Sequence, residues 1–168
     1  ETVEEMAKMF SEPFGMEISA KKTPAIMNLL ERGIRTLKQV GSLPKRHYMR
    51  RRPYDRFNEP TLVPAEEERL RTNGSYPSGH TVRAWSMALL LIEVNPSAQD
   101  ALLQYAYEWG QSRVIAGFHW QSDVDASKVL VSGAYPSLHT NDVFMADMRK
   151  AQAEFKKLSA AKNGKKVK

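Results

Sequence analysis

The chain has 168 residues and a mass of 19.1 kDa, and its 42% hydrophobic and 26% charged residues fit one globular domain with a real core. Cysteine is absent, which excludes disulfides, thiolate catalysis and thiolate metal sites. The net charge of +6 suits anionic substrates, nucleic acid or an acidic surface. The longest apolar runs, such as residues 87–92, are far too short to span a bilayer. The acidic first residues are unlike a secretion signal, so we expect a mature or trimmed product.

In chain order, the first predicted element is a short helix over residues 3–10, which Pro13 should stop. A longer helix is predicted over residues 19–40, because apolar residues recur there at helical spacing. The Gly-Ser-Leu-Pro sequence of residues 41–44 should break this pattern. The densest cationic run of the chain, residues 45–53, follows directly.

The middle of the chain alternates between a loop and two helices. Residues 54–72 contain two prolines and a charged cluster, which predicts a long loop with one short helix. A core helix is predicted over residues 78–94, where an apolar run follows a proline and ends before an Asn-Pro pair. Ser97 should cap the next helix, over residues 99–115, which has one apolar face.

Two further helices are predicted near the C-terminus. Ser122 and Asp125 have the spacing of a capping box, and they should start a helix through residue 138 that Pro136 bends. Asn141 should cap a last amphipathic helix that ends near residue 157. The residues predicted to form the apolar seam of this helix are Val143, Met145, Met148, Ala151 and Phe155.

The fold class expected from these elements is all-α, a single-domain helical bundle. No strand, repeat or internal linker is evident in the pattern. The domain should cover residues 1–160, and the basic residues 161–168 should form a solvated, flexible tail.

The sequence Tyr-Pro-Ser-Gly-His at residues 76–80 carries a possible anion site. A proline favours the first turn of a helix, so Ser78 and Gly79 should lie where backbone N–H groups point outward unpaired. Such a helix start binds anions, and His80 could move a proton beside a bound anion. The alternative is a capped helix with an incidental histidine.

Two more groups would complete a site for phosphate chemistry. Lys45 precedes Arg52 in the cationic run, and Arg113 precedes His119 and Asp123. Phosphoryl oxygens require preorganised donors, which the fork of arginine and the point charge of lysine supply. Two histidines could act as nucleophile and acid. Asp123, four residues after His119, could fix which nitrogen of the His119 ring carries the hydrogen.

Each of these groups has an ordinary structural alternative. The cationic run could be a solvated patch or a site for RNA phosphates. Arg113 could pair with Glu108 or Asp123, and His119 could be a hydrogen-bonded core residue. Asp123 could instead favour its helix start by charge–dipole attraction. A metal site built from the four histidines is not expected, because no pair of them has the spacing of known zinc sites.

Together the three groups match K-x6-R-P, P-S-G-H and S-R-x5-H-x3-D, the signature of the phosphatidic-acid-phosphatase type 2 and vanadium haloperoxidase superfamily. More narrowly, "KRHYMRRRPY", "NGSYPSGHT" and "GQSRVIAGFHWQSDVDAS" resemble bacterial class A nonspecific acid phosphatases over residues 9–155. The resemblance implies an all-helical phosphatase that acts on phosphate monoesters without metal or cofactor. It also implies a periplasmic or secreted protein, with no stable membrane insertion and no nucleic-acid partner.

The resemblance also assigns roles to residues. It makes His119 the nucleophile that becomes phosphorylated, Asp123 the group that orients it, and His80 the general acid and then base. The residues implied in binding the phosphate oxygens are Lys45, Arg52, Ser78, Gly79 and Arg113. Substrates would be nucleotides, sugar phosphates and aryl phosphates, with transfer of phosphate to alcohols as a further reaction, and vanadate should inhibit.

The chain departs from the resemblance at several positions. Glu31 falls near a pocket glutamate of the family, but its spacing to Lys45 differs. Arg83 stands where relatives carry a small or apolar residue; it could add charge to the pocket or pair with a glutamate. Relatives usually carry a further segment before the position of Glu1, so we expect either a trimmed chain or a pocket rim that is built differently. Many relatives have a cysteine at the position of Ala116. We expect a homodimer or higher homo-oligomer, because the bundle should be exposed where that segment is missing.

Two other functional classes stay open at this point. A vanadate-dependent haloperoxidase would use the same signature, with vanadate bonded to His119. A basic helical module could bind nucleic acid through residues 45–52, although no aromatic stacking platform accompanies them. The second reading also leaves both motif histidines without a role.

Overall fold

The computed structural model describes residues 2–166, with side chains described as far as residue 161. All regular structure in this range is helical, without strands, so the predicted all-α fold class is confirmed. The elements are α1 (Val3–Phe14), α2 (Pro24–Leu37), η1 (Lys38–Gly41), α3 (Ser42–Tyr48), α4 (Pro53–Phe57), η2 (Pro64–Glu66), α5 (Glu67–Arg71), α6 (Gly79–Val94), η3 (Pro96–Ala98), α7 (Gln99–Ile115), α8 (Gln121–Ala134), η4 (Tyr135–Thr140) and α9 (Asp142–Lys166).

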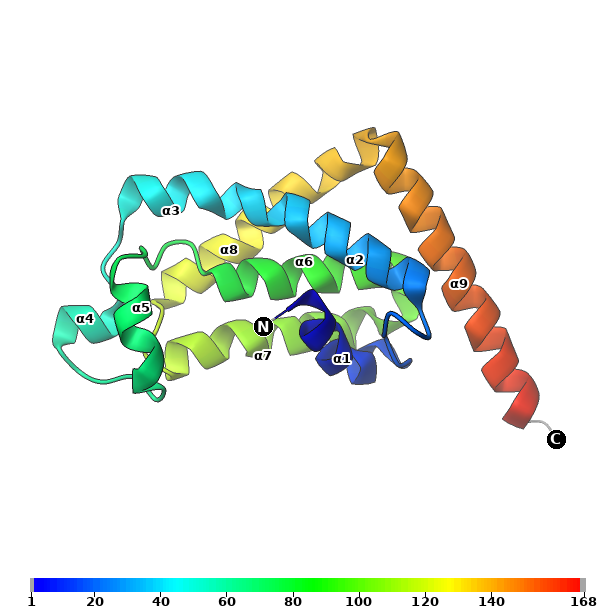
Figure 1. Ribbon diagram of the computed structural model, residues 1–168, viewed down its shortest axis with the longest axis horizontal. Coiled ribbons are helices and arrows are strands. Elements are labelled where there is room, and N and C mark those ends of the chain that lie inside the picture. Colours follow the sequence, from blue (N-terminus) through cyan, green and yellow to red (C-terminus); the bar gives the residue numbers. More distant parts are fainter. Residues whose placement is uncertain (1, 167–168) are drawn as a thin grey trace.

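Helix α6 is the centre of the bundle and lies between α2 and α7 (Figure 1). Helices α8 and α9 also contact it. Only the short η3 segment joins α6 to α7, so the two helices run antiparallel. The start of α6, the end of α7 and the start of α8 therefore meet at one end of the molecule, where α3, α4 and α5 lie (Figure 1).

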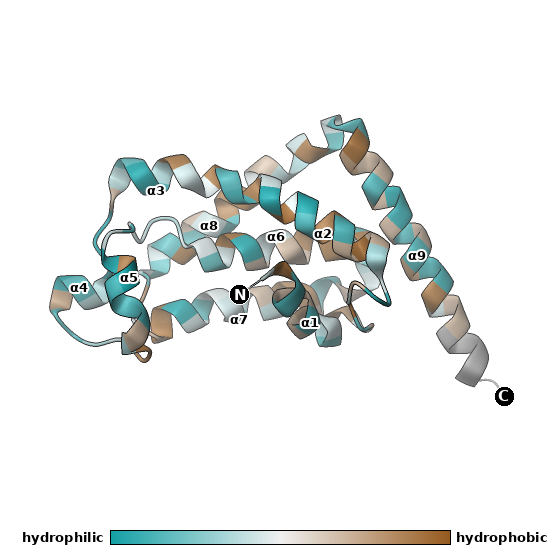
Figure 2. Cartoon of the chain, in the orientation of Figure 1, coloured by the Kyte–Doolittle hydropathy of each residue, from teal (hydrophilic) through white to brown (hydrophobic). Residues whose placement is uncertain are grey.

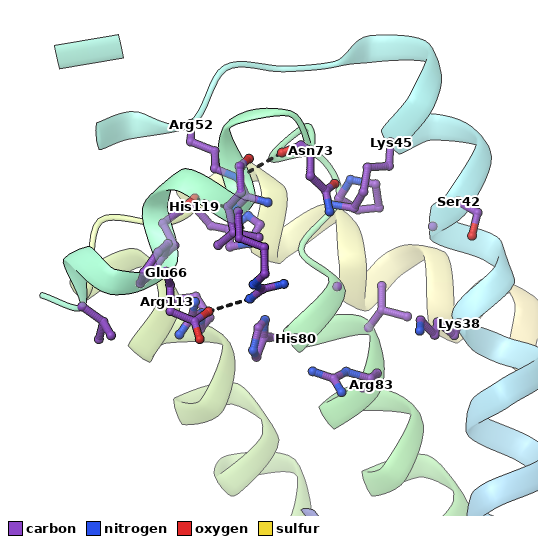
Figure 3. Close-up of a pocket in the computed structure, with 18 residues that line it drawn as sticks. Lys38, Ser42, Lys45, Arg52, Glu66, Asn73, His80, Arg83, Arg113 and His119 are labelled. Atoms are coloured by element: carbon purple, nitrogen blue, oxygen red, sulfur yellow. Dashed lines mark hydrogen bonds and ion pairs between the residues drawn. The ribbon is translucent and has the colours of Figure 1, made fainter. Parts of the chain in front are cut away.

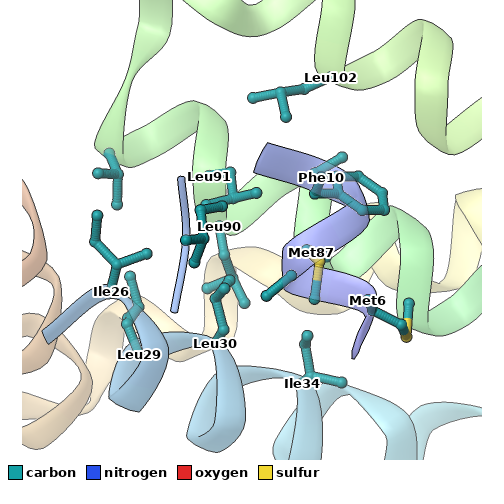
Figure 4. Close-up of a cluster of buried hydrophobic side chains, with 14 of the residues drawn as sticks. Met6, Phe10, Ile26, Leu29, Leu30, Ile34, Met87, Leu90, Leu91 and Leu102 are labelled. Carbon is teal, nitrogen blue, oxygen red and sulfur yellow. The ribbon is translucent and has the colours of Figure 1, made fainter. Parts of the chain in front are cut away.

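The hydrophobic core fills the space between α1, α2, α6, α7 and α9, and Figure 4 shows part of it. Its largest fully buried side chains include Phe10, Leu30, Leu90 and Leu91. Each such side chain stabilises the fold by roughly 1.5–3 kcal/mol through burial. Gly33 lets α2 approach α6 closely, because a Cβ built on it would lie 2.8 Å from Leu90 Cδ1.

The opposite end of the bundle is more polar. Figure 2 shows hydrophilic residues over much of α4 and α5, at the left of the view. A small second cluster packs there around Tyr54, Leu70 and Phe118. None of the helices in residues 2–166 combines the length and apolar character that a membrane span requires.

The first helices differ from the prediction at their ends. α1 continues to Phe14 with Pro13 inside it, and Gly15 ends it with a φ of 81°. The stop comes from Gly15, because only glycine enters this left-handed conformation without steric cost. α2 begins at Pro24, not at residue 19, because proline at a first helical position loses no needed N–H bond. Thr23 instead closes a turn, accepting the Ser19 N–H at 3.0 Å.

The predicted break at residues 41–44 is wrong, and residues 54–72 contain more helical structure than the one short helix predicted within a long loop. The chain continues from α2 through η1 into α3, because Pro44 falls in the first turn of α3, where a proline is tolerated. The loop contains two short α-helices and a 3₁₀ turn. Pro53 and Pro64 start two of these elements, so both prolines act as helix starts.

The bounds of α6 and α7 match the prediction, but two predicted caps do not. Ala98 precedes α7, and the Ser97 hydroxyl donates to Asn95 Oδ1 at 2.6 Å. Helix α8 starts at Gln121, where Trp120 is the N-cap, so Ser122 and Asp125 form no capping box. Pro136 lies in η4 and does not bend α8, which has already ended at Ala134.

The last helix is capped as predicted. Asn141 Oδ1 accepts the backbone N–H groups of Val143 and Phe144 at 3.0 and 3.1 Å. Val143 does not belong to the seam, because its side chain is 49% exposed while Phe144 is buried in its place. α9 continues to Lys166, past the predicted end. Residues 167–168 of the expected tail lie outside the described residues, and its flexibility stays a prediction.

Candidate active site

A cavity of about 580 Å³ opens at the polar end of the bundle (Figure 3). It is lined from η1 and α3, from α5 and the residues after it, from the start of α6, and from the end of α7 and the segment before α8. Seven of the ten predicted site residues line it: Lys45, Arg52, Gly79, His80, Arg83, Arg113 and His119. The fold thus brings Lys45, His80 and His119 into one site, although at least 35 positions separate any two of them in the sequence.

His119 is positioned by the turn that follows α7. Gly117 has a φ of 83° and reverses the chain there. The backbone N–H groups of Phe118 and His119 then both donate to the Arg113 carbonyl, at 3.0 and 3.2 Å. The imidazole is 3% exposed, with Nδ1 3.4 Å from Asp123 Oδ2 and Nε2 3.2 Å from Arg52 Nη1. Because Arg52 can only donate, Nε2 is the acceptor nitrogen and Nδ1 carries the hydrogen.

The pKa of His119 is lowered to about 4, chiefly because burial disfavours the charged ring. The hydrogen bond to Asp123 acts in the opposite direction, and the nearby cations Arg52 and Lys45 add to the lowering. At neutral and mildly acidic pH the ring is therefore neutral, with a lone pair on Nε2. This is the protonation state that a nucleophilic imidazole requires.

Asp123 lies behind His119 and is fully buried. Its Oδ2 also accepts the Trp120 N–H at 2.9 Å, and its Oδ1 accepts from Arg50 Nη1 at 2.7 Å. The pKa of this carboxyl is lowered despite burial, which by itself would raise it, because these donors and His119 stabilise the anion. The carboxylate consequently stays ionised and fixes the His119 tautomer.

Arg50 was missed by the sequence analysis, although it lies in the cationic run. Besides the ion pair with Asp123, its Nη1 donates to Ser122 Oγ at 2.7 Å, and its guanidinium stacks over the Trp120 ring at 5.3 Å. No feature of the sequence distinguishes Arg50 from its neighbour Arg51, whose guanidinium pairs with Asp55. Arg50 is thus an arginine that pairs with Asp123.

Arg52 is 4% exposed and is held by backbone carbonyls. Nε donates to the carbonyls of Leu70 and Asn73 at 3.2 and 3.0 Å, and Nη1 donates to the Phe118 carbonyl at 3.1 Å. Nη2 has one long contact, 3.4 Å, to the Gly74 carbonyl, and the other N–H of this nitrogen can donate to a ligand in the cavity. Burial is the main cause that lowers the pKa of Arg52, but an arginine stays charged.

Lys45 reaches the same cavity from α3. Its ammonium donates to the Gly74 carbonyl at 2.8 Å. Burial, with a smaller contribution from Arg52, lowers the pKa of Lys45 to about 8, and Asp123 partly offsets this. Lys45 is thus a cation at neutral pH, and it loses its charge in mildly alkaline solution.

The start of α6 differs in one respect from the prediction. The Ser78 N–H does not point outward unpaired; it donates to Ser127 Oγ at 2.9 Å, and Ser78 Oγ caps the helix by accepting the Thr81 N–H at 3.4 Å. Ser78 is buried and does not line the cavity. Gly79 does line it, and no atom lies within 4 Å of the position a Cβ would occupy there. A ligand can therefore approach the backbone at Gly79.

His80 and Arg113 face the cavity from α6 and α7. Burial, followed by the charges of Arg113, Arg83 and His119, lowers the pKa of His80 to about 3. The Arg113 guanidinium stacks over the Phe118 ring at 4.2 Å. Such stacking fixes the plane of the guanidinium fork beside the cavity.

The remaining predicted residue, Glu31, lies exposed on α2 and does not line the cavity. Among the described residues, no group of three or more histidine, aspartate and glutamate side chains is arranged to hold a metal ion. Chemically, the cavity offers an anion three cations from separate elements, an open backbone position at a helix start, and two neutral imidazoles. These features suit an anionic ligand such as a phosphoryl group.

Comparisons with known proteins agree with this assignment. Residues 29–146 match the family model of the PAP2 superfamily. The chain is 46% identical to a non-specific acid phosphatase of Providencia stuartii over 154 residues, and 40% identical to one of Salmonella typhimurium over 158 residues. Each alignment covers 91% of this chain and 62% of the relative, so the chain spans about 62% of the length of these relatives.

A third relative, an acid phosphatase of Zymomonas mobilis, is 36% identical over 143 residues and 85% of this chain. The family match includes all three motifs and every cationic residue implied in phosphate binding. The resemblance noted from the motifs is therefore confirmed. The chain belongs to the PAP2 superfamily.

Proposed function

We propose that this protein is a metal-independent acid phosphatase that hydrolyses phosphate monoesters through a phosphohistidine formed on His119. One observation carries the proposal: a neutral His119, oriented by an ionised Asp123, shares one cavity with His80 and with three phosphate-binding cations. The names of the relatives support the same reaction class.

In the first step His119 Nε2 attacks phosphorus. A P–N bond forms, the P–O bond to the alcohol breaks, and the departing oxygen takes a proton from His80. The ring of His119 becomes cationic as the bond forms, and Asp123, 3.4 Å from Nδ1, stabilises that charge. Lys45, Arg52 and Arg113 meet the charge on the phosphoryl oxygens.

In the second step water attacks the phosphohistidine. His80 now accepts a proton from the water, the P–N bond breaks, and phosphate leaves. The same cavity would allow an alcohol to take the place of the water, which would transfer the phosphate to that alcohol.

The low pKa of His80 fits this cycle only if the proton arrives with the substrate. A phosphate monoester has a second pKa near ~6, so below that pH it enters as a monoanion that still carries a proton. Its negative charge also offsets Arg113 and Arg83, which disfavour protonated His80. His80 can then relay the proton to the leaving oxygen, and activity should be highest at acidic pH.

Hydrolysis of an aryl phosphate with and without a chelator, beside bromide oxidation with added vanadate, tests the reaction class. We expect hydrolysis that resists the chelator, no bromide oxidation, and inhibition by vanadate, tungstate or molybdate as phosphate mimics. Activity lost to the chelator and restored by a divalent ion would contradict the proposal. Bromide oxidation would favour the haloperoxidase reading.

The roles of the two histidines are tested by quenched-flow labelling with a radioactive phosphate ester. We expect an acid-labile, base-stable label on His119, and no label in His119→Ala. In His80→Ala, activity on p-nitrophenyl phosphate should survive better than activity on an alkyl phosphate, because a phenolate leaves without a proton. A label on His80 would reverse the two roles. His47→Ala is the control, because His47 is an exposed histidine outside the cavity.

The proposal extends to the setting of the protein. By the same resemblance we propose a periplasmic or secreted enzyme that forms a homodimer or higher homo-oligomer. A nucleic-acid-binding role is disfavoured, because Lys45 and Arg52 of the cationic run line the cavity and Arg50 pairs with Asp123. Sedimentation of the purified protein measures the oligomeric state.

A further inference from the structure

The cavity is larger and more cationic than one phosphoryl group requires. Of the described residues that line it, six are lysine or arginine and one, Glu66, is a carboxylate. Arg69 pairs with Glu66 at 2.7 Å, which neutralises that carboxylate. Lys45, Arg52 and Arg113 serve the phosphoryl group in the mechanism above. Lys38 and Arg83 are two further cations on the cavity wall, and the mechanism above assigns neither of them a contact with the phosphoryl group.

Arg83 lies on the leaving-group side of the site. It follows His80 by three residues on α6, so the two side chains are neighbours on one face of the helix. Figure 3 shows its guanidinium extending beside the His80 ring. The charge of Arg83 contributes to the lowered pKa of His80, which places the two groups within electrostatic reach of each other.

Lys38 reaches the same part of the cavity from η1. This element is pressed against the start of α6 at Gly41, where an added Cβ would lie 3.2 Å from Pro77 Cγ and 3.7 Å from Val82 Cγ2. The close approach brings the Lys38 side chain to the cavity wall, and Figure 3 shows it pointing toward the space that Arg83 also borders. The two cations come from separate elements that are packed together, so their proximity is fixed by the fold.

We propose that Lys38 and Arg83 form a second anion subsite, which selects phosphomonoesters whose alcohol portion carries a further phosphate or carboxylate. The proposal rests on the function proposed above, because it places the leaving group next to His80. A cavity of about 580 Å³ is within the range of sites for whole small-molecule ligands, so a substrate with two anionic ends fits by volume.

Two matched substrates test the subsite. Propane-1,3-diol bisphosphate and 3-hydroxypropyl phosphate have the same alkyl leaving group and differ only in the second phosphoryl group. We expect the wild-type kcat/KM for the bisphosphate, halved for its two equivalent ends, to exceed that for the monophosphate by about tenfold. The ratio should fall as salt is added, because salt screens exposed charges. 4-(Phosphonooxy)butanoate tests a carboxylate in the same way.

The variants are Arg83→Gln, Lys38→Gln and both together. We expect each single change to lower the ratio about threefold and the double change to bring it within twofold of unity. Lys38→Gln should leave hydrolysis of the monophosphate nearly unchanged. Arg83→Gln also alters the electrostatic environment of His80, so its effect is read from the ratio of the two substrates. Arg35→Gln is the matched control, because it removes the same charge from an exposed residue of α2 that does not line the cavity. Lys38 is itself exposed, so its variant should fold even if Arg83→Gln does not.

The outcomes separate the two proposals. If the wild-type protein hydrolyses neither substrate, the phosphatase proposal fails and the subsite fails with it. If it hydrolyses both with equal kcat/KM, the phosphatase proposal stands and the subsite is overturned. A ratio that Arg35→Gln lowers as much as the two variants would also overturn it, since the effect would then come from net charge alone.

Discussion

The two ends of helix α6 lie in opposite environments. Toward its C-terminus, Leu90 and Leu91 are fully buried among apolar side chains of the other helices (Figure 4). Its N-terminus borders a cavity in which buried cations and imidazoles are held by carbonyls and a carboxylate (Figure 3). The first environment gains free energy by removing apolar surface from water, and the second must offset the cost of desolvating charge.

The difference predicts how substitutions divide between stability and activity. Apolar residues of the core should affect the free energy of unfolding and leave turnover alone. Buried polar residues of the cavity should affect turnover strongly, because their orientation and charge act on the reacting atoms. One helix runs through both regions, so the division can be tested within a single cooperative domain.

The largest effect is expected for Asp123→Asn. An amide can donate to His119 Nδ1, which moves the ring hydrogen to Nε2 and removes the nucleophilic lone pair. We expect kcat to fall by roughly 10²- to 10⁴-fold, on the scale of other tautomer-setting carboxylates. The loss should appear in kcat, while vanadate still binds and the circular dichroism spectrum is unchanged.

Asp125→Asn is the matched control. Asp125 lies on the same helix, is exposed, and pairs with Lys128 at 2.9 Å, away from the cavity. It should retain nearly full activity. If Asp123→Asn also kept kcat within a few-fold of wild type, the carboxylate would serve only to cap α8, and the division between the two regions would fail at its strongest point.

A smaller effect, confined to stability, is expected for Leu90→Ala. Leu90 is fully buried against Gly33, and deleting such a side chain costs about 3 kcal/mol through lost burial and the cavity left behind. Urea unfolding followed by circular dichroism measures this cost. We expect kcat to stay within twofold of wild type at temperatures where the variant is folded.

Val129→Ala, on the exposed face of α8, removes apolar groups from a side chain that is already 72% exposed and should change stability little.

Gly33→Ala should be more favourable in the Leu90→Ala background than in the wild type, because the added methyl group then meets space in place of Leu90 Cδ1. A large loss of kcat in Leu90→Ala would show that the two ends of α6 are coupled.

The sequence predicted the long helices better than the short ones. Helices α6 and α7 were placed correctly because a continuous apolar run or face spans them and clear signals, such as Ser78 and Asn95-Pro96, border them. Only one short helix was predicted where α4, η2 and α5 lie, because Pro53 and Pro64 look alike as breakers and as first helical residues. Tertiary packing around Tyr54 and Leu70, which is not local in sequence, decides between the two.

The site was predicted where local spacing carries the geometry. His119 and Asp123 are four residues apart across the start of α8, and Gly79 stands at the start of α6, so their placement is local in sequence. Arg50, Ser127 and Lys38 could not be found in this way. Arg50 meets Asp123 across 73 positions and Ser127 meets Ser78 across 49, and no local pattern indicates such pairs.

The smallest effect concerns pH. Deprotonation of a cavity residue, Lys45, should lower kcat/KM while the free energy of unfolding rises. Lys45 has a folded-state pKa of about 8, below the value of an exposed lysine. Because kcat/KM reports groups of the free enzyme, it should fall as pH rises through about 8, where the ammonium loses the charge that binds phosphate. Lys45→Arg should move this alkaline limb to higher pH, because a guanidinium stays charged.

The contribution of Lys45 to stability should have the opposite sign. Between about 8 and the unfolded-state pKa near ~10.4, the unfolded chain binds a proton that the folded chain has released, so this group makes the free energy of unfolding rise with pH. Urea titrations of the wild type and of Lys45→Arg across that window measure the difference, and Lys128→Arg, on α8 away from the cavity, is the control. An alkaline limb that persists unchanged in Lys45→Arg would assign it to another group. A difference that does not change with pH would mean that folding leaves the pKa of Lys45 at its unfolded value, and one that falls with pH would mean that folding raises it.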